Sequence, residues 1–429
     1  MVQTEALYAL YLKHPLVQTD SRQLREGCLF FALKGPHFNG NAYAAEALRK
    51  GAAYAVIDEP AYRTDERMLL VDDVLGSLQA LAECHRKQLS IPVLAITGSN
   101  GKTTTKELCR EVLSRKYRVY ATEGNLNNHI GVPLTLLRIG PETELAIIEM
   151  GANHQQEIAS YCRIAHPTHG LITNCGKAHL EGFGGIEGVR KGKGELFDYL
   201  RDHEGMAFIC SDFEYFQSMS RNIPSIFWYG TTGHPDLSGS ILDARHFLEV
   251  DCSYSGPVRS HLVGAYNIYN ILAALAVGCF FKVDGQQARQ AIEAYQPTNQ
   301  RSQFLKIGPY DVILDAYNAN PSSMKAAIEN FAAMEGSDKV LMLGAMMELG
   351  EDSCAEHEEL LRIIGRYPWK SVLLVGGDFS GLEHPYTYVP DSQAAAGWLR
   401  NQSWPHATLL IKGSRSTRME RILEAIPAA

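Results

Sequence analysis

A glycine-rich turn between an apolar strand and a helix is the first stretch whose residue types can do chemistry. The run PVLAIT leads into GSNG, and KTTTKELCREVLSRK continues with an amphipathic, helical pattern. Glycines let the backbone approach phosphate oxygens, and the N–H groups at a helix start hold the anion. The spacing G-x-x-G-K-T is shorter than the usual P-loop pattern, but its strand and helix favour a nucleotide site over a plain turn. The predicted ATP-binding residues here are Gly98, Ser99, Asn100, Gly101, Lys102, Thr103 and Thr104.

Within the turn, we expect Lys102 to reach the β and γ phosphates and the Thr103 hydroxyl to ligate Mg²⁺. Two further side chains, Glu149 and His179, lie at or after the ends of apolar strands of the same predicted sheet. Glu149 ends the apolar strand within the run ELAIIEM, a place where P-loop proteins commonly put a metal-binding acid. His179 follows the run THGLITN, and its imidazole could take a second metal ion. Without the glycine-rich turn, Glu149 would be better interpreted as an acid that faces solvent, and His179 as a structural histidine.

The elements that must position these groups form three successive α/β patterns. A chain of 429 residues is too long for one ordinary core. Short apolar strands alternate with helices, which predicts largely parallel sheets. We predict a small N-terminal α/β domain over 1–82, a central P-loop domain with a mostly parallel sheet over 83–297, and a Rossmann-like, doubly wound C-terminal domain over 298–429.

Composition excludes several classes of protein. The net charge is −8 with no long basic run, so nucleic acid is not an expected partner. No segment has the about 20 apolar residues of a membrane span, and the first residues lack the pattern of a secretory signal. Nine cysteines without a C-x-x-C pair indicate free thiols in a reducing compartment. We therefore expect a cytoplasmic protein.

Several longer motifs together resemble the Mur ligase family. The combination of GNLNNHIGVPLTLL with DAYNANP is much more specific than G-x-x-G-K-T alone. The resemblance reaches nearly the whole chain, because TDSR and LFFALKG resemble the family's N-terminal domain and GAMMELG and KGSRSTRME its C-terminal domain. The motifs that carry it occupy residues 19–22, 29–35, 122–137, 147–159, 173–185, 189–197, 314–324, 344–350 and 412–420.

The resemblance implies an ATP-dependent amide ligase, most similar to the branch that adds D-Ala-D-Ala to UDP-MurNAc-tripeptide in peptidoglycan precursor synthesis. It implies ATP and two Mg²⁺ ions as cofactors, and a carbamylated lysine, for which Lys193 is chosen over Lys191 in RKGKGELF. Lys102, Glu149, His179 and Lys193 would be the catalytic groups, with Thr103, Glu149, His179 and Lys193 around metal. The expected state is a monomer.

The resemblance also implies the residues around each substrate. Asn267 and Asn270 would contact adenine, and Arg301 and Asp315 would reach the γ-phosphate and ribose. The expected UDP-sugar contacts are Ser21, Arg22, Asn125, Asn127 and Asn128, and those of the dipeptide side are Asn318, Asn320, Glu348 and His357. The chain departs from the family at Tyr266 (usually His), Gln156 (usually Gly), Asn39 (usually Asp) and Asn41 (usually His).

Three alternatives stay open at this point. A folylpolyglutamate synthase-like enzyme typically reads G-K-G-S, where this chain has GKTTTK. The ligase that adds the third peptide residue typically has a DYAHTP-like stretch in place of DAYNANP. A non-catalytic nucleotide-binding protein would need neither His179 nor a lysine after it.

Overall fold

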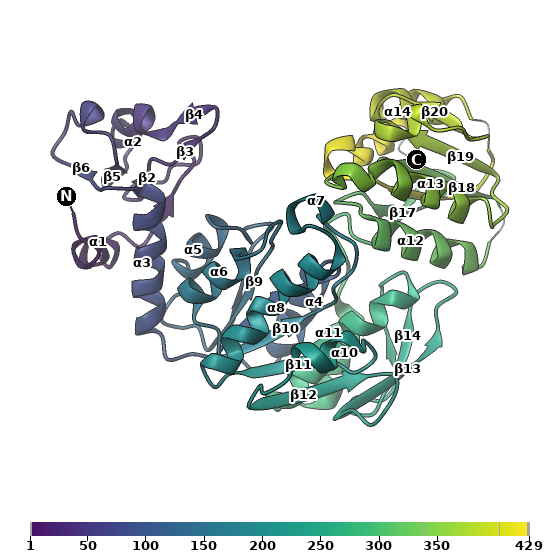
Figure 1. The fold of residues 1–429 in the computed structure, drawn as a ribbon, viewed down its shortest axis with the longest axis horizontal. Helices are drawn as coiled ribbons and strands as arrows, with labels where there is room; N and C mark the ends of the chain where they lie inside the picture. The colour runs from purple at the N-terminus through teal and green to yellow at the C-terminus, as the bar shows by residue number, and fades with distance from the viewer. Residues whose placement is uncertain (1, 337, 403, 427–429) are drawn as a thin grey trace.

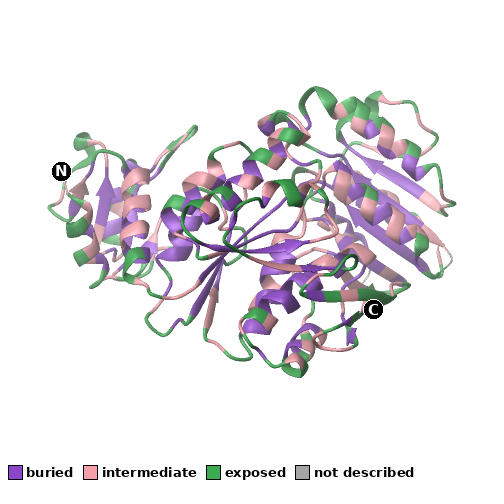
Figure 2. Cartoon of the chain, turned by 60° about the horizontal axis from the view of Figure 1, so that its bottom comes forward, coloured by how far each residue is buried: buried purple, intermediate pink, exposed green. Residues whose placement is uncertain are grey.

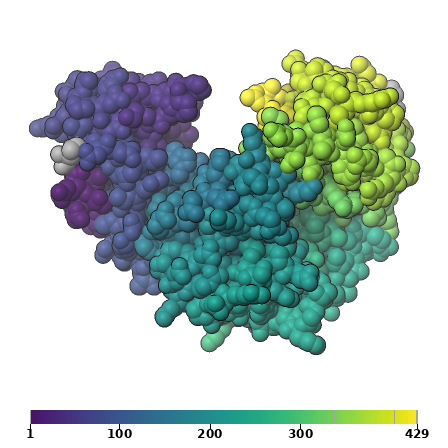
Figure 3. All heavy atoms as spheres, viewed as in Figure 1, coloured from purple at the N-terminus to yellow at the C-terminus, as the bar shows by residue number. Residues whose placement is uncertain are grey.

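The computed structural model describes residues 2–336, 338–402 and 404–426, and it contains three α/β units. Figure 1 shows the first unit and the third unit on opposite sides, both above the central one. The space-filling view shows an open notch between the first and third units, floored by the central unit (Figure 3). Across the described ranges, no helix is long and apolar enough to cross a membrane.

The first unit holds a four-stranded parallel sheet in the order β1-β2-β5-β6. Strands β2 and β5 are almost wholly buried, as expected for a parallel sheet covered on both faces. The long helix α3 then leads to the central unit, so the predicted limit at residue 82 lies inside a helix, and the domain limits stay predictions. The elements are α1 (Thr4–Tyr11), β1 (Val17–Gln18), β2 (Leu29–Phe31), β3 (Lys34–Gly35), β4 (Phe38–Asn39), α2 (Ala44–Arg49), β5 (Tyr54–Ile57), β6 (Met68–Leu70) and α3 (Val74–Gln88).

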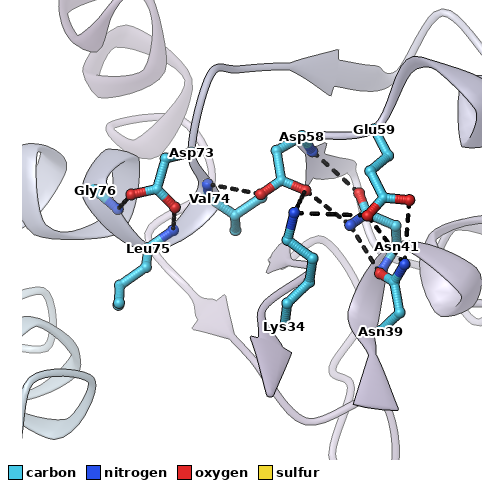
Figure 4. A network of polar contacts seen from close by, with 9 residues as sticks. All are labelled: Lys34, Asn39, Asn41, Asp58, Glu59, Asp73, Val74, Leu75 and Gly76. Atoms are coloured by element: carbon cyan, nitrogen blue, oxygen red, sulfur yellow. Dashed lines mark hydrogen bonds and ion pairs between the residues drawn. The ribbon is translucent and has the colours of Figure 1, made fainter. Parts of the chain in front are cut away.

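A polar network ties the β3–β4 hairpin to the loop after β5 (Figure 4). The Lys34 ammonium lies 3.1 Å from an Asp58 carboxylate oxygen, and the Asn41 amide donates to the same carboxylate at 2.8 Å. The Asn39 amide donates to Glu59 at 3.1 Å. Asn39 and Asn41, two positions at which the sequence departs from the pattern of the family it resembles, thus supply neutral amides to the connection between the hairpin and the loop.

The central unit is a nine-stranded sheet in the order β15-β14-β13-β12-β11-β10-β7-β9-β8. Strands from β8 to β13 pair in parallel, and β14 and β15 add an antiparallel edge, which confirms the mostly parallel sheet. Helices α4, α10 and α11 pack together, and α5, α6 and α8 form a second group that includes contacts to α3. Strands β7, β9 and β11 are buried along their whole length, whereas β12 and β13 toward the antiparallel edge are largely exposed or half-buried. Figure 2 shows buried and exposed strands in the same view.

The central strands are β7 (Val93–Thr97), β8 (Val119–Ala121), β9 (Leu145–Glu149), β10 (His169–Ile172), β11 (Met206–Cys210), β12 (Ser225–Gly230), β13 (Leu237–Asp243), β14 (Glu249–Cys252) and β15 (Val258–Arg259). The helices are α4 (Lys102–Leu113), α5 (Gly131–Leu136), α6 (Glu157–Ala165), α7 (Leu180–Phe183), α8 (Ile186–Asp202), α9 (Tyr215–Met219), α10 (Ile268–Phe280) and α11 (Gly285–Ala294).

The third unit is a six-stranded sheet in the order β16-β17-β21-β18-β19-β20, parallel except at the β16 edge. Alternate strand residues belong to two different hydrophobic clusters, one with α12 and α13 and the other with α14. Both faces are therefore covered, as a doubly wound fold requires. The elements are β16 (Gln303–Ile307), β17 (Tyr310–Asp315), α12 (Pro321–Ala333), β18 (Lys339–Gly344), α13 (Ser353–Ile364), β19 (Ser371–Val375), β20 (Thr387–Val389), α14 (Ser392–Arg400) and β21 (Ala407–Lys412).

Candidate active site

A cavity of about 1610 Å³ lies between the central and third units, where the strands β7, β9, β10 and β17 end. Binding at the carboxyl ends of parallel strands is the general rule for open α/β sheets. The lining combines the glycine-rich turn, the Asn-rich loop and the linker between the two units. Its members include residues 99–104, 124, 125, 127–129, 149, 151–153, 174–176, 266, 267, 269, 270, 294–296, 298–302, 315, 317, 318, 320, 322 and 323, with His179, Glu348, Lys412 and Arg415.

The glycine-rich turn has the backbone of an anion site. Gly98 and Gly101 have φ of 141° and 80°, in the region that favours glycine. A Cβ at Gly98 would lie 2.0 Å from the Thr173 hydroxyl, and one at Gly101 would lie 2.5 Å from the Asn270 amide oxygen. Only glycine fits these close approaches, so the turn can present N–H groups at the start of α4.

The Lys102 ammonium lies over this turn. Its Nζ donates to the Gly98 carbonyl at 2.7 Å, and the Ser99 carbonyl is at 3.3 Å. Desolvation lowers the pKa of Lys102 to about 8, and the Glu149 carboxylate opposes that shift. A lysine in this place supplies positive charge to whatever phosphate the turn holds.

Glu149 is completely buried and lies beside Thr103. Its Oε1 accepts from the Thr103 hydroxyl at 3.1 Å and from the Asn127 amide at 2.7 Å. Its Oε2 has no hydrogen-bond partner among the described residues. A buried carboxylate oxygen without a donor, next to a hydroxyl, is a donor set that fits Mg²⁺.

Protein groups could supply only part of the ligand shell. Within the described parts of the chain, no three His, Cys, Asp or Glu residues cluster as a metal site. Mg²⁺ commonly keeps several waters and binds through one or two protein groups plus substrate phosphates, a role that the Thr103 hydroxyl and the Glu149 carboxylate are able to fill.

His179 meets the third unit. Its Nδ1 lies 2.5 Å from an Oε2 of Glu348, and this contact is the largest cause of the lowered pKa of Glu348. Both residues have left-handed backbone conformations, with φ of 52° and 63°. The contact lacks hydrogen-bond geometry, because Nδ1 has no hydrogen-bond partner among the described residues. A carboxylate beside Nδ1 nevertheless leaves Nε2 for another partner, as it does where proteins orient metal-binding histidines.

Two further contacts join the same parts of the central and third units. The Lys177 ammonium lies 2.5 Å from Glu356, and the Asn320 amide donates to the Asn100 side chain at 2.8 Å. The turn that would hold phosphate and the strand-end loop of His179 are thus both attached to the third unit.

Lys193 is buried, whereas Lys191 is exposed. Its Nζ donates to the Ala152 carbonyl at 3.0 Å and lies 4.8 Å from the centre of the Phe183 ring. Burial, with a smaller contribution from the charge of Lys102, lowers the pKa of Lys193 to about 7. A substantial part of this amine is therefore neutral at physiological pH.

Asn267, directly before α10, and Asn270, in the first turn of α10, line the cavity, and Asn270 also contacts α4. The Asn270 amide oxygen accepts from Thr105 at 3.0 Å, and its amide nitrogen donates to Asn267 at 2.7 Å. Tyr266, which stands where the family usually has His, has its hydroxyl 2.9 Å from that of Ser302 in the linker. These residues therefore join the central unit to the linker beside the cavity.

The linker end of the cavity holds Arg301 and Asp315. The Arg301 guanidinium stacks 3.7 Å from the centre of the Tyr317 ring. Asp315 accepts from the Ser302 N–H at 3.1 Å and from the Lys412 ammonium at 2.6 Å. Lys412, Tyr317 and Arg415 were missed by the sequence analysis; the only signal for Lys412 was its place at the end of the last strand.

Most of the predicted site residues meet in this cavity, but five do not line it. Gly98 and Lys193 lie behind the lining residues that they contact, and Ser21 and Arg22 are in the first unit. Arg22 is highly exposed and pairs with Asp20. His357 is fully buried, with Nε2 accepting from the Met346 N–H and Nδ1 contacting the Ser353 carbonyl.

Comparison with known proteins agrees with this geometry. The Mur ligase middle domain matches residues 96–278, the Mur ligase glutamate ligase domain matches 300–415, and the Mur ligase family catalytic domain matches 15–91. The chain belongs to the Mur ligase family. This Mur ligase is 35% identical over 430 residues to the UDP-N-acetylmuramoyl-tripeptide–D-alanyl-D-alanine ligase of Bacillus subtilis, covering 95% of this chain and 92% of the relative.

Other relatives give the same result. The ligase of that name from Escherichia coli is 34% identical, covering 96% of this chain and 93% of its own. A crystal structure of MurF from Acinetobacter baumannii aligns with a TM-score of 0.86 at 31% identity, covering 95% and 92%. MurF of Thermotoga maritima in complex with ADP has a TM-score of 0.85 at 27% identity, covering 96% and 97%. This Mur ligase therefore has the three-unit α/β architecture expected from the sequence.

Proposed function

We propose that this Mur ligase uses ATP to join D-Ala-D-Ala to the terminal carboxylate of UDP-MurNAc-tripeptide. The observation that carries the proposal is the cavity in which the Lys102 turn and the buried Glu149–Thr103 pair face the third unit. The substrates come from the names of relatives that match this chain almost end to end.

The reaction has two steps. A carboxylate oxygen of the tripeptide attacks the γ-phosphorus of ATP, which forms an acyl phosphate and releases ADP. The amine of D-Ala-D-Ala then attacks the acyl carbon, loses a proton, and expels inorganic phosphate as the amide forms. Lys102 and the N–H groups of the turn offset the charge that resists approach of a carboxylate to a triphosphate. No general base for the amine is assigned.

Mg²⁺ would lie at Thr103 and Glu149, and a second ion would take His179 and a carbamylated Lys193. When bound, these ions would polarise the γ-phosphate and neutralise charge. The unpartnered Glu149 Oε2 supports the first assignment. The Glu348 contact on His179 Nδ1, which leaves Nε2 available, supports the second.

The environment of Lys193 supports carbamylation there. Only a neutral amine adds to CO₂, and burial lowers the pKa of Lys193 to about 7. Lys191 is exposed and lacks this burial. The Ala152 carbonyl, which accepts from the Lys193 amine at 3.0 Å, belongs to the segment that follows Glu149.

The remaining assignments concern the linker end of the cavity, the Asn-rich loop, the third unit and two residues of the first unit that lie outside the cavity. Asn267 and Asn270 would read adenine, and Arg301 and Asp315 would reach the γ-phosphate and ribose. Contacts to the UDP-sugar would come from Ser21, Arg22, Asn125, Asn127 and Asn128, and contacts to the dipeptide from Asn318, Asn320 and Glu348. The engaged ring nitrogens of His357 favour a structural role in place of the expected dipeptide contact.

The test is phosphate release from ATP and Mg²⁺ with UDP-MurNAc-tripeptide, with and without D-Ala-D-Ala. We expect release to depend on both substrates. Release that ignores the dipeptide, or that requires a folate and glutamate, would contradict the proposal. The same assay with UDP-MurNAc-dipeptide and a free diamino acid tests the alternative that the protein adds the third peptide residue, which predicts phosphate release with that pair of substrates. We also propose a cytoplasmic monomer with the domain limits given above.

A further inference from the structure

A lysine that the proposed mechanism does not use lies under the phosphate site. Lys106 is completely buried in α4, and it does not line the cavity. It follows Thr103 by three residues, a spacing that puts two side chains on the same helix face. The two side chains approach the same carboxylate, because the Thr103 hydroxyl donates to Glu149 Oε1 and the Lys106 ammonium lies 3.8 Å from Oε2.

The ammonium also holds the start of the Asn-rich loop. Lys106 Nζ donates to the Thr122 carbonyl at 2.6 Å, directly after β8. The Thr122 hydroxyl in turn accepts from the Glu149 N–H at 2.9 Å. From the same loop, the Asn127 amide donates to Glu149 at 2.7 Å. Lys106 therefore joins three segments: the helix after the glycine-rich turn, the end of β9, and the loop between β8 and α5.

Positively and negatively charged side chains alternate around Lys106. A fully buried carboxylate such as Glu149 needs a nearby positive charge, because burial without compensation is costly. Lys106 supplies one, and Glu107 lies on its other side at 2.9 Å. Arg110 pairs with Glu107 at 3.0 Å. Arg110 also pairs with Glu111 at 2.7 Å. The result is an alternating row, Glu111–Arg110–Glu107–Lys106–Glu149, that ends at the Glu149 oxygen that accepts no hydrogen bond among the described residues.

We propose that Lys106 is a positioning residue for this oxygen: it fixes the Glu149 carboxylate between the glycine-rich turn and the Asn-rich loop, so that a divalent cation meets it already oriented. The proposal rests on the proposed function only in taking Mg²⁺ as that cation. It predicts that loss of Lys106 weakens metal binding, although removing a positive charge should by itself strengthen it. Loss of positioning and loss of a positive charge change the metal affinity in opposite directions, so a binding measurement distinguishes them.

The experiment uses Mn²⁺ as the probe, with a non-hydrolysable ATP analogue bound, and measures the Mn²⁺ dissociation constant by electron paramagnetic resonance. For Lys106→Met we expect the constant to rise about tenfold or more, as for other groups that orient a metal ligand. Lys106→Arg, which keeps the charge, should lie closer to the wild-type protein. Lys116→Met is the matched control, since it removes an exposed lysine just beyond α4. An unchanged or lower constant in Lys106→Met would overturn the proposal.

Two additions keep the result unambiguous. If Lys106→Met does not fold, Lys106→Gln is measured in its place. Glutamine removes the ammonium beside Glu149, which the proposal makes responsible for fixing the carboxylate, so unchanged Mn²⁺ binding in that variant would overturn the proposal equally. Phosphate release by the wild-type protein is measured in parallel. Failure of the proposed ligase activity would appear there, whereas failure of the Lys106 proposal would appear only in the Mn²⁺ constants.

Discussion

Lys193 should lower the stability of the folded protein, so replacing it by methionine should raise the free energy of unfolding. Burial lowers the pKa of Lys193 from its ordinary 10.5 to about 7. The unfolded chain therefore binds this proton more tightly, and the folded state loses stability as pH falls from 10.5 toward 7. At about 1.36 kcal/mol per pKa unit, the penalty is about 4 kcal/mol at pH 7 and about 2 kcal/mol at pH 9.

Methionine would remove this penalty and leave the Ala152 carbonyl without its donor, which costs about 1 kcal/mol. The expected net gain for Lys193→Met is thus about 3 kcal/mol at pH 7, shrinking to about 1 kcal/mol at pH 9. The assay is thermal unfolding at both pH values in CO₂-free buffer, because carbamylation would remove the positive charge. Lys191→Met, which removes the exposed neighbour, is the control.

The pH dependence decides the outcome. A gain that stays constant between pH 7 and pH 9 would mean that packing, not charge, limits stability at Lys193. A loss of stability at both pH values would refute the reasoning from burial altogether. A gain in stability with a loss of ligase activity would be the expected trade-off at a functional site.

Three other variants test separate parts of the site. Lys102→Ala should abolish phosphate release while circular dichroism stays unchanged, and near-normal release would refute the assignment of the turn. Gly98→Ala, whose Cβ would lie 2.0 Å from the Thr173 hydroxyl, should weaken ATP-analogue binding at least tenfold in calorimetry, and unchanged affinity would contradict the close approach. Lys193→Ala should regain activity with added short carboxylic acids, whereas activity equal to the wild type without them would move the functional lysine elsewhere.

The sequence located the parts of the site that depend on local pattern. The glycine-rich turn was visible because a strand, two glycines and a helix are consecutive in the chain. Glu149 was visible because the carboxyl ends of neighbouring parallel strands meet at one edge, and β7 and β9 are such neighbours. The three α/β patterns followed from runs of apolar strands alternating with helices.

What the sequence did not reveal depends on contacts between distant segments. Lys412 pairs with Asp315, 97 residues away, and Glu348 meets His179 across two units. Neither pairing has a local pattern. The contacts of Lys106 were hidden for the same reason, since Glu149 ends β9 and Thr122 follows β8. At Gln156, by contrast, the sequence did carry a local signal. This residue stands where the family usually has glycine, and its φ of 71° lies in the region that favours glycine.

The central claim is that the γ-phosphate held over Lys102 activates a carboxylate. It is tested most directly with UDP-MurNAc-tripeptide carrying ¹⁸O in its terminal carboxylate, ATP, Mg²⁺ and D-Ala-D-Ala, with mass analysis of the released phosphate. An acyl phosphate requires one labelled oxygen to leave with phosphate for each amide formed. Amide formation that leaves the released phosphate unlabelled would contradict the account.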